Sequence, residues 1–280
     1  MVAHDAAIEP KAAYALGTSG AESARLQRQA DELLPESREL IDGTGLGAGQ
    51  SAIDLGCGPR GIVDLLAERV SPGGRVVGLD ADPAMVKMAS EYVANHRLAG
   101  VEVICGDARS CGLPSDTFDL VHARTLLINV PEPQQIIGEM VRLARPGGWV
   151  VGLEPDIQHV ICHPPNSAFE RLCEIFEVAH SRNGADHHIG RRLPKLYRGA
   201  GLIDVTVQVR AALYPVGHTR RTIRPDLVRS IRPHILRLGI ADGRELDRLD
   251  AAARTHLADP EVLVMPSLNF LAWGRKNVAA

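Results

Sequence analysis

The sequence predicts an α/β fold built on a doubly wound, Rossmann-like sheet. Short apolar runs alternate with segments of helical periodicity, an order that is typical of parallel strands covered by helices. The run at 52–55 leads into a turn with Gly56, Gly58 and Gly61, and helical spacing begins at Ile62. Glycine has no Cβ, so a ligand can lie against bare backbone here. A strand, a glycine turn and a helix in this order are typical of a nucleotide site at the carboxyl edge of a sheet.

The units that follow support this sheet in chain order. Pro83 is a typical first-turn residue and opens the second helix, and the glycines at 147 and 148 turn the chain into the fifth strand. Beyond that strand we expect a loop at 156–165 and then mainly helices. The predicted strands are 52–55, 75–79, 101–105, 118–123, 149–153, 203–209 and 268–273, and the predicted helices are 62–70, 83–93, 132–143, 166–180, 191–201, 225–238 and 243–257.

Residues 1–49 precede the sheet and predict a helical lid. Residues 24–34 form an amphipathic pattern, a second helical piece covers 36–42, and the glycine-rich 43–49 links both to the first strand. We expect the first helix to lie over the open mouth above the glycine turn; packing on the edge of the domain is the alternative. Exchange of this helix between subunits would give a homo-oligomer.

Composition limits the classes of partner. The net charge of −3 is spread over interspersed acids and bases, so we expect no nucleic-acid partner. Five cysteines without a CxxC spacing fit a reducing cytoplasm. We recognise no signal peptide and no apolar run of the ~20 residues that a membrane helix needs, which predicts a cytoplasmic protein without a membrane partner. Arg220, Arg221, Arg224 and Arg229 form the densest basic group, and we expect a solvated helix face there.

The glycine turn alone has two interpretations. The sequence Gly56-Cys-Gly-Pro-Arg-Gly61 fits the dinucleotide fingerprint, and Asp80 follows at about the spacing of its ribose-binding acid. Asp54 argues against a nicotinamide enzyme, because a carboxylate inside the strand needs a cationic or hydrogen-bonding partner. The charged amino group of a methionine-derived cofactor would serve.

The stretch resembles motif I of class I S-adenosylmethionine-dependent methyltransferases. An acid ends the second strand, and Gly106-Asp-Ala108, Phe118-Asp-Leu-Val121 and Leu143-Ala-Arg-Pro-Gly-Gly148 follow in methyltransferase order. The resemblance covers about 51–156 and is to the UbiE/MenG-like small-molecule branch. It implies seven strands with an antiparallel last strand. Arg60 stands where that family usually has its third glycine, so Gly61 is expected to take over by a one-residue shift.

The resemblance also implies how the adenosine is bound. Asp80 is expected to accept hydrogen bonds from both ribose hydroxyls, and short charge-assisted bonds explain why a carboxylate is wanted there. Ala81 leaves room beside the adenosine. Asp107 is expected to accept from the adenine amino group, with the Ala108 amide donating to the ring; a turn-capping role is the alternative for Asp107.

The methionine part of the cofactor is expected beside the glycine turn. Gly56, Cys57 and Gly58 let the backbone approach it, and Asp54 holds its ammonium group. Arg124 opens the loop beneath the sulfonium. Its backbone is the expected contact because its charge would repel the sulfonium.

Three further residues are candidates at the mouth of the site. By resemblance, Tyr14 anchors the lid over the cofactor as a catalytic and cofactor-binding residue, and Arg25 binds the cofactor carboxylate; a packed tyrosine and a surface arginine are the alternatives. His159 is the candidate base because its ordinary pKa suits proton removal near neutrality. A structural histidine is the alternative, and the histidine spacing predicts no metal site.

The chain is expected to divide into a lid at 1–49, a core at 50–213 and 267–280, and a helical substrate cap at 214–266, with a purely structural bundle as the alternative for the cap. The resemblance implies methyl transfer from S-adenosyl-L-methionine to a small, largely apolar natural-product acceptor. This would be C- or O-methylation, including that of prenylated or terpenoid compounds in secondary-metabolite biosynthesis. The alternatives are a nicotinamide-dependent oxidoreductase and a non-methylating cyclase on the same fold.

Overall fold

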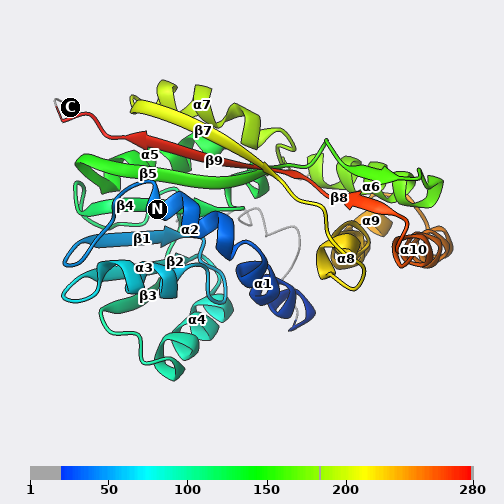
Figure 1. Cartoon of the computed structure of the whole chain (residues 1–280), viewed down its shortest axis with the longest axis horizontal. Coiled ribbons are helices and arrows are strands. Elements are labelled where there is room, and N and C mark those ends of the chain that lie inside the picture. The colour runs from blue at the N-terminus through cyan, green and yellow to red at the C-terminus, as the bar shows by residue number, and fades with distance from the viewer. Residues whose placement is uncertain (1–19, 183, 279–280) are drawn as a thin grey trace, which may run out of the picture.

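The computed structural model describes residues 20–182 and 184–278, and a seven-stranded sheet forms its centre (Figure 1). The strand order is β3-β2-β1-β4-β5-β9-β7, and β9 runs antiparallel to both of its neighbours. The predicted Rossmann-like sheet with an antiparallel last strand is therefore confirmed. The strands are β1 (Ser51–Leu55), β2 (Arg75–Asp80), β3 (Val101–Cys105), β4 (Phe118–Arg124), β5 (Ala144–Asp156), β7 (Ile203–Ala211) and β9 (Leu268–Arg275).

Helices cover both faces of this sheet, and the strand sequences match that double cover. Successive residues of β1 point to opposite faces, so Ala52 packs in one apolar cluster and Ile53 in the other. Asp82 caps α4 by accepting a 2.8 Å hydrogen bond from the Ala84 amide. One face carries α2 (Leu34–Asp42), α3 (Val63–Val70) and α4 (Pro83–Asn95), and the other carries α5 (Pro133–Leu143) and α7 (Ile189–Gly199).

The N-terminal helices have different attachments. In α2, Leu40 and Ile41 are fully buried against the sheet, and Trp273 Nε1 donates a 2.7 Å hydrogen bond to the Leu40 carbonyl. The preceding helix, α1 (Gly20–Glu32), instead lies between the core and the helices at the far end of the molecule (Figure 1). Only α1 is therefore placed to act as a lid, while α2 belongs to the core. Tyr14 lies outside the described residues.

The far end of the molecule is a separate helical cap drawn from two parts of the chain (Figure 1). Helix α6 precedes β7 in sequence, yet it packs on α8 and α10, which follow β7, around an apolar cluster of its own. We define the cap by α6 (Ser167–Ser181), the 3₁₀ helix η2 (Thr219–Thr222), α8 (Ile223–Ser230), α9 (Arg232–Arg237), α10 (Gly243–Leu257) and the antiparallel pair of β6 (Ile161–His163) and β8 (Leu263–Met265).

Two predicted elements of this region need correction. The helix expected at 225–238 is two helices, because Pro233 enters the first turn of α9 and the chain bends at Ile231. The loop expected at 156–165 contains β6, which is too short to show a strand pattern and forms only because β8 pairs with it. None of the helices in the described part of the chain is long and apolar enough to cross a membrane.

The basic group at 220–229 is not a solvated helix face. Arg220, Arg221 and Arg224 are only 8%, 4% and 4% exposed. Arg221 donates to the carbonyls of Tyr214, Leu257 and Asp259, so it satisfies the C-terminal end of α10. Of the four arginines, only Arg229 lies at the surface, where it pairs with Asp250.

Candidate active site

The glycine turn is held by Asp80 at the end of β2. Its carboxylate accepts hydrogen bonds from the Gly58 amide at 2.8 Å and from the Asp82 amide at 2.9 Å. Gly58 has a positive φ of 57°, and a Cβ added to it would meet open space. A ligand can therefore approach the Gly58 backbone from the free side, next to a carboxylate that is only partly buried.

Gly61 fills the role expected for the third glycine. Its φ is also 57°, and an added Cβ would lie 2.1 Å from Asp54 Oδ2, which excludes every other residue. Arg60 instead forms ion pairs with Asp31 and Asp64, and its guanidinium lies over the ring of Tyr92. The one-residue shift expected from the sequence thus has a steric reason.

Asp54 organises the turn from beneath. It is 2% exposed, its Oδ1 lies 2.7 Å from His122 Nδ1, and its Oδ2 accepts from the Ile62 amide at 2.9 Å. Asp54 and His122 are direct partners in the register of β1 and β4. His122 was missed as a site residue, although a polar residue in the middle of each apolar strand was a usable signal. A role of Asp54 toward an ammonium stays a prediction.

The residues expected around the adenine lie at the same edge of the sheet. Asp107 follows β3 and accepts three hydrogen bonds from Arg109, through its amide and its guanidinium. Ala108 is buried beside it, and Ala81 is exposed after β2. An adenine amino group would thus compete with the exposed Arg109 for the Asp107 carboxylate, and the adenine-binding role of Asp107 stays a prediction.

Arg124 joins the turn to the N-terminal helices. Its Nη1 donates to Ser37 Oγ at 2.9 Å and its Nη2 to the Gly61 carbonyl at 3.3 Å. The guanidinium is therefore drawn toward α2. A small cavity beside the turn is lined by Leu26, Gln29, Asp54, Gly56, Cys57, Gly58, Pro59, Gly61, Arg124 and Thr125.

Glu154 and Asp156 stand at the end of β5 and His159 follows it, and the three side chains differ in burial. Glu154 is fully buried and accepts hydrogen bonds from the amides at 126, 127 and 128, which open the 3₁₀ helix η1 (Leu127–Asn129). Burial raises the pKa of Glu154 to about 8, although the three N–H donors act in the opposite direction. Asp156 is also buried and is ion-paired with Arg191. His159 is exposed, and its catalytic role stays a prediction.

A larger cavity, which we call the acceptor cavity, lies between α1, the loop after β4 and the cap. It encloses about 700 Å³ of empty space that is open to solvent. Its walls are mostly apolar, with Leu26 and Leu33 from the N-terminal helices, Phe176 from α6, and Ile223 and Leu227 from α8. Arg25 also lines it and donates to Gln29 Oε1 at 2.7 Å.

A buried histidine pair adjoins this cavity, and no pattern in the sequence predicts it. His180 lines the acceptor cavity, and its Nδ1 lies 3.0 Å from His187 Nε2. Asn129 Nδ2 donates to the Thr125 carbonyl, which leaves Oδ1 to face His180 Nε2 at 3.1 Å. His180 Nε2 is therefore assigned the proton. Burial lowers the pKa of His180 to about 3, so the ring is neutral at pH 7.

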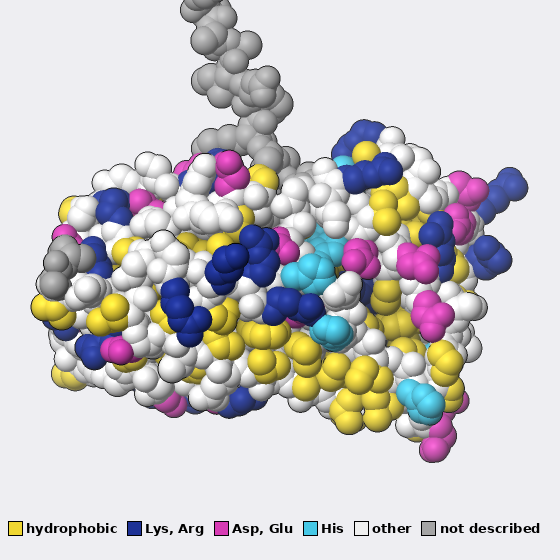
Figure 2. All heavy atoms as spheres, turned by 90° about the horizontal axis from the view of Figure 1, so that it is seen from above, with side chains coloured by type: hydrophobic (Ala, Val, Ile, Leu, Met, Phe, Trp, Pro, Cys, Tyr) yellow, Lys and Arg dark blue, Asp and Glu magenta, His cyan; other side chains and the backbone are white. Residues whose placement is uncertain are grey.

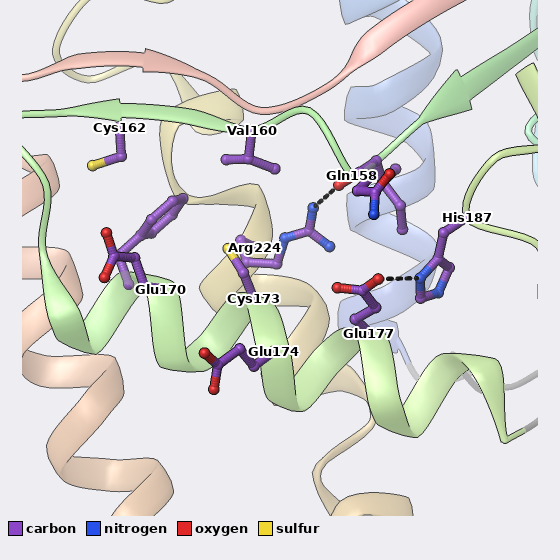
Figure 3. A pocket seen from close by; sticks show the side chains of 11 residues that line it. Gln158, Val160, Cys162, Glu170, Cys173, Glu174, Glu177, His187 and Arg224 are labelled. Carbon is purple, nitrogen blue, oxygen red and sulfur yellow. Dashed lines mark hydrogen bonds and ion pairs between the residues drawn. The ribbon is translucent and has the colours of Figure 1, made fainter. Parts of the chain in front are cut away.

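Figure 3 shows a third cavity, between α6 and the chain at 157–162, that we call the cap cavity. Glu170, Glu174 and Glu177 of α6 line one side of it, and Arg224 reaches from α8 toward the chain at Gln158. His187 lines its other end, with Nδ1 3.9 Å from Glu177 Oε1. On the face drawn in Figure 2, histidine side chains gather near the middle with acidic ones beside them toward the cap.

Comparison with known proteins gives this geometry a family. Residues 53–152 match the model of a methyltransferase domain family. A demethylmenaquinone methyltransferase of Geobacillus sp. (strain WCH70) is 31% identical over 193 residues, which cover 61% of this chain and 80% of that protein. An uncharacterized 37.1 kDa protein in transposon TN4556 of Streptomyces fradiae is 36% identical over 169 residues, 60% of this chain; the chain spans about half of that relative, 48%.

Among solved structures, phosphoethanolamine N-methyltransferase 2 from Haemonchus contortus, in complex with phosphomonomethylethanolamine and S-adenosylhomocysteine, has a TM-score of 0.56. The match covers 87% of this chain and 52% of that chain at 18% identity, so it shows a similarity of fold alone.

The chain therefore belongs to the class I S-adenosylmethionine-dependent methyltransferases, as the order of its motifs predicts. It is an enzyme of this family with S-adenosylmethionine as its cofactor, and its likeness to the UbiE/MenG-like branch is confirmed. The nicotinamide interpretation of the glycine turn is not favoured. The residues present fit the cofactor, because the open face of Gly58 and the Asp80 carboxylate are side by side.

Proposed function

We propose that the enzyme transfers the methyl group of S-adenosylmethionine to a small molecule held in the acceptor cavity. One observation carries this proposal. Leu26, Gln29 and Thr125 line both the cavity at the glycine turn and the acceptor cavity. The two cavities therefore share a wall, and a methyl group presented from the glycine turn would face the acceptor directly.

The protein's own part in such a reaction is positioning and exclusion of water. The cofactor supplies an already activated methyl group. The glycine turn and Asp80 would fix its two ends, and α1 with the cap would hold the acceptor in line with the methyl and away from solvent. His180, neutral and held by His187 and Asn129 through its two ring nitrogens, is part of the wall against which the acceptor would lie.

The mostly apolar walls support a largely apolar natural-product acceptor, with C- or O-methylation as the chemistry. Addition of the methyl group to an alkene, as in a prenylated compound, needs no base beforehand. It releases S-adenosylhomocysteine and leaves a carbocation, which then loses a neighbouring proton to give the methylated alkene, and an apolar cavity suits this step. Methylation of a hydroxyl needs a group to take its proton, and His159 is the candidate from sequence. We propose α1 as the lid, with Arg25 and Tyr14 toward the cofactor.

The cofactor site is tested by Asp80→Ala with Asp82→Ala as the matched control. Asp80→Ala should lower the affinity for S-adenosylhomocysteine at least about thirtyfold, because it removes charge-assisted bonds to the ribose and the support of Gly58. Asp82→Ala removes only the N-cap of α4 and should cost about 1 kcal/mol of stability. Isothermal titration calorimetry measures the affinity of both variants for S-adenosylhomocysteine, and thermal unfolding measures their stability. An affinity of Asp80→Ala equal to that of the wild type would refute the site.

Methyl transfer itself is tested with methyl-labelled cofactor and a panel of small apolar phenols and alkenes. Label moving to one of them supports the proposal. A chain that binds S-adenosylhomocysteine but converts substrates without moving label would instead be a cyclase. Tight binding of NAD without binding of S-adenosylmethionine would restore the nicotinamide alternative.

A further inference from the structure

The acceptor cavity is positively charged at its cap end. Among the described residues that line it, Arg25, Arg220 and Arg224 are cations, and none is an aspartate or a glutamate. His180 adds no charge at pH 7. A cavity made for a neutral hydrocarbon gains nothing from these charges, because each one has to be desolvated.

The partners of Arg220 and Arg224 differ. Arg220 Nε lies 3.0 Å from Glu32 Oε2, and both side chains are nearly buried, so α1 supplies the counter-charge of Arg220. In the described part of the chain, no carboxylate forms an ion pair with Arg224. Arg224 is therefore the cation whose charge the protein leaves without a paired carboxylate.

The contacts of Arg224 are those of a guanidinium held in place but not neutralised. It is 4% exposed, and its Nη2 donates to the Ile157 carbonyl at 3.2 Å (Figure 3). Its guanidinium carbon lies 4.8 Å from the centre of the Phe176 ring. Its Nε is buried with no hydrogen-bond partner. The Cys173 thiol also contacts the guanidinium, and burial raises the pKa of that thiol and keeps it neutral. A carbonyl, an aromatic face and a neutral thiol orient a cation, but they leave its full charge for a ligand.

The acidic residues of the cap cavity do not neutralise Arg224. Glu177 is the carboxylate that acts most on Arg224 electrostatically, yet half of its side chain is exposed. Water screens such a charge, whereas an anion inside the acceptor cavity would meet Arg224 at low dielectric. Glu170 and Glu174 are likewise at the surface of α6.

We propose that the acceptor carries an anionic oxygen-bearing group, a carboxylate or a phosphate ester, which binds Arg224 near Arg220 at the cap end of the acceptor cavity. This inference rests on the proposed function, because it assumes that the cavity binds the methyl acceptor. The apolar body of the molecule lies along Leu26, Phe176 and Leu227, and the atom to be methylated points to the wall shared with the glycine turn. The charge of the acceptor thus selects its orientation as well as its identity.

The test uses three probes that share one apolar body: 4-phenylbutanoate, 3-phenylpropyl phosphate and the neutral 4-phenylbutanamide. Each is titrated into the full chain saturated with S-adenosylhomocysteine. At least one anion should bind about tenfold or more tightly than the amide. The tighter anion identifies a carboxylate or a phosphate as the group. Equal affinity for all three probes would overturn the inference.

Three variants on α8 make the result specific. Arg224→Gln should remove the preference for the anion, and Arg224→Lys should restore part of it because the charge returns. Arg229→Gln lies on the same helix, but its side chain is 63% exposed and pairs with Asp250, so the preference should stay unchanged. Melting temperature and affinity for S-adenosylhomocysteine confirm that each variant is folded.

The outcomes separate this inference from the proposed function. Anion preference lost in Arg224→Gln, with no label ever transferred to any compound, leaves the anion site standing and refutes methyl transfer. Label transferred equally well to neutral acceptors by the wild type and by Arg224→Gln keeps methyl transfer and refutes the anion site.

Discussion

At the scale of single residues, the site depends on carboxyl groups that hold backbone. Asp80 fixes Gly58, Asp54 fixes Ile62, and Glu154 fixes the first turn of η1. A carboxylate accepts several hydrogen bonds at once, so one side chain can set the shape of a whole loop. These residues make the edge of the sheet rigid enough to present a ligand.

Glu154 should make stability depend on pH. Its pKa is about 8 in the folded protein and near 4.5 when unfolded, so between these values the folded state binds the additional proton. The stability this provides is full below about pH 4.5 and is lost as pH rises through 8. We expect the free energy of unfolding to fall between pH 5 and pH 9, as measured by urea denaturation at each pH.

Glu154→Gln isolates this effect, because glutamine does not titrate. The free energy of unfolding of this variant should therefore change less with pH than that of the wild type. At pH 6 the substitution should cost less than about 1 kcal/mol, because the protonated carboxyl of the wild type also presents a donor to one of the three N–H groups. Glu177→Gln, an exposed change, should keep the slope. A slope of the same size in Glu154→Gln would assign the pH dependence to other groups.

At the scale of elements, α1 is fastened at both ends of the acceptor cavity. Glu32 pairs with Arg220 of η2, and Asp31 pairs with Arg60 beside the glycine turn. The lid thus contacts the cap and the core through two charge pairs on adjacent residues. Helix α1 contributes Leu26 to both cavities, so the proposed lid would control access to each of them.

Glu32→Gln should loosen this lid. Removal of the carboxylate leaves Arg220 buried without its counter-charge, and α1 should then spend more time detached. We expect S-adenosylhomocysteine to dissociate about three- to tenfold faster, with a melting temperature close to that of the wild type, because the core does not include α1. Stopped-flow fluorescence measures the dissociation rate.

Glu68→Gln is the matched control for the lid variant. Its pair with Arg38 is exposed and screened by water, so its loss should leave the dissociation rate unchanged. An unchanged rate in Glu32→Gln would show that α1 does not close over the cofactor.

The elements also show what the sequence could and could not predict. The strands and the glycine turn follow from local signals, since apolar runs and glycines mean much the same wherever they occur. The burial of Arg221 depends on carbonyls 36 and 38 positions away, and the pairing of Asp54 with His122 depends on strand register. Such partners meet only after folding, which is why the basic group was expected at the surface and the cap was expected without α6.

At the scale of the whole molecule, the two ligands are assigned to different units. The cofactor site is built on the sheet, while the cap supplies Phe176, His180, Arg220, Arg224 and Leu227 to the acceptor cavity. The cap has its own apolar cluster, and β5, β7 and β9 run from the core toward it (Figure 1). Each unit can therefore lose packing without the other losing its ligand first.

A pair of core substitutions tests this division. Leu246 is 2% exposed in the cap cluster, and Leu66 is fully buried in the core cluster beside the glycine turn. Each change to alanine should cost about 2–5 kcal/mol in its own unit. Leu246→Ala should weaken binding of the anionic probe at least about fivefold and keep the affinity for S-adenosylhomocysteine within twofold, whereas Leu66→Ala should weaken both. Calorimetry with the two ligands, together with hydrogen exchange of α10 and β1 amides, separates the units. If Leu246→Ala weakened the binding of both ligands equally, cap and core would unfold as one unit. The loss of packing in α10 would then have destabilised the glycine turn as well.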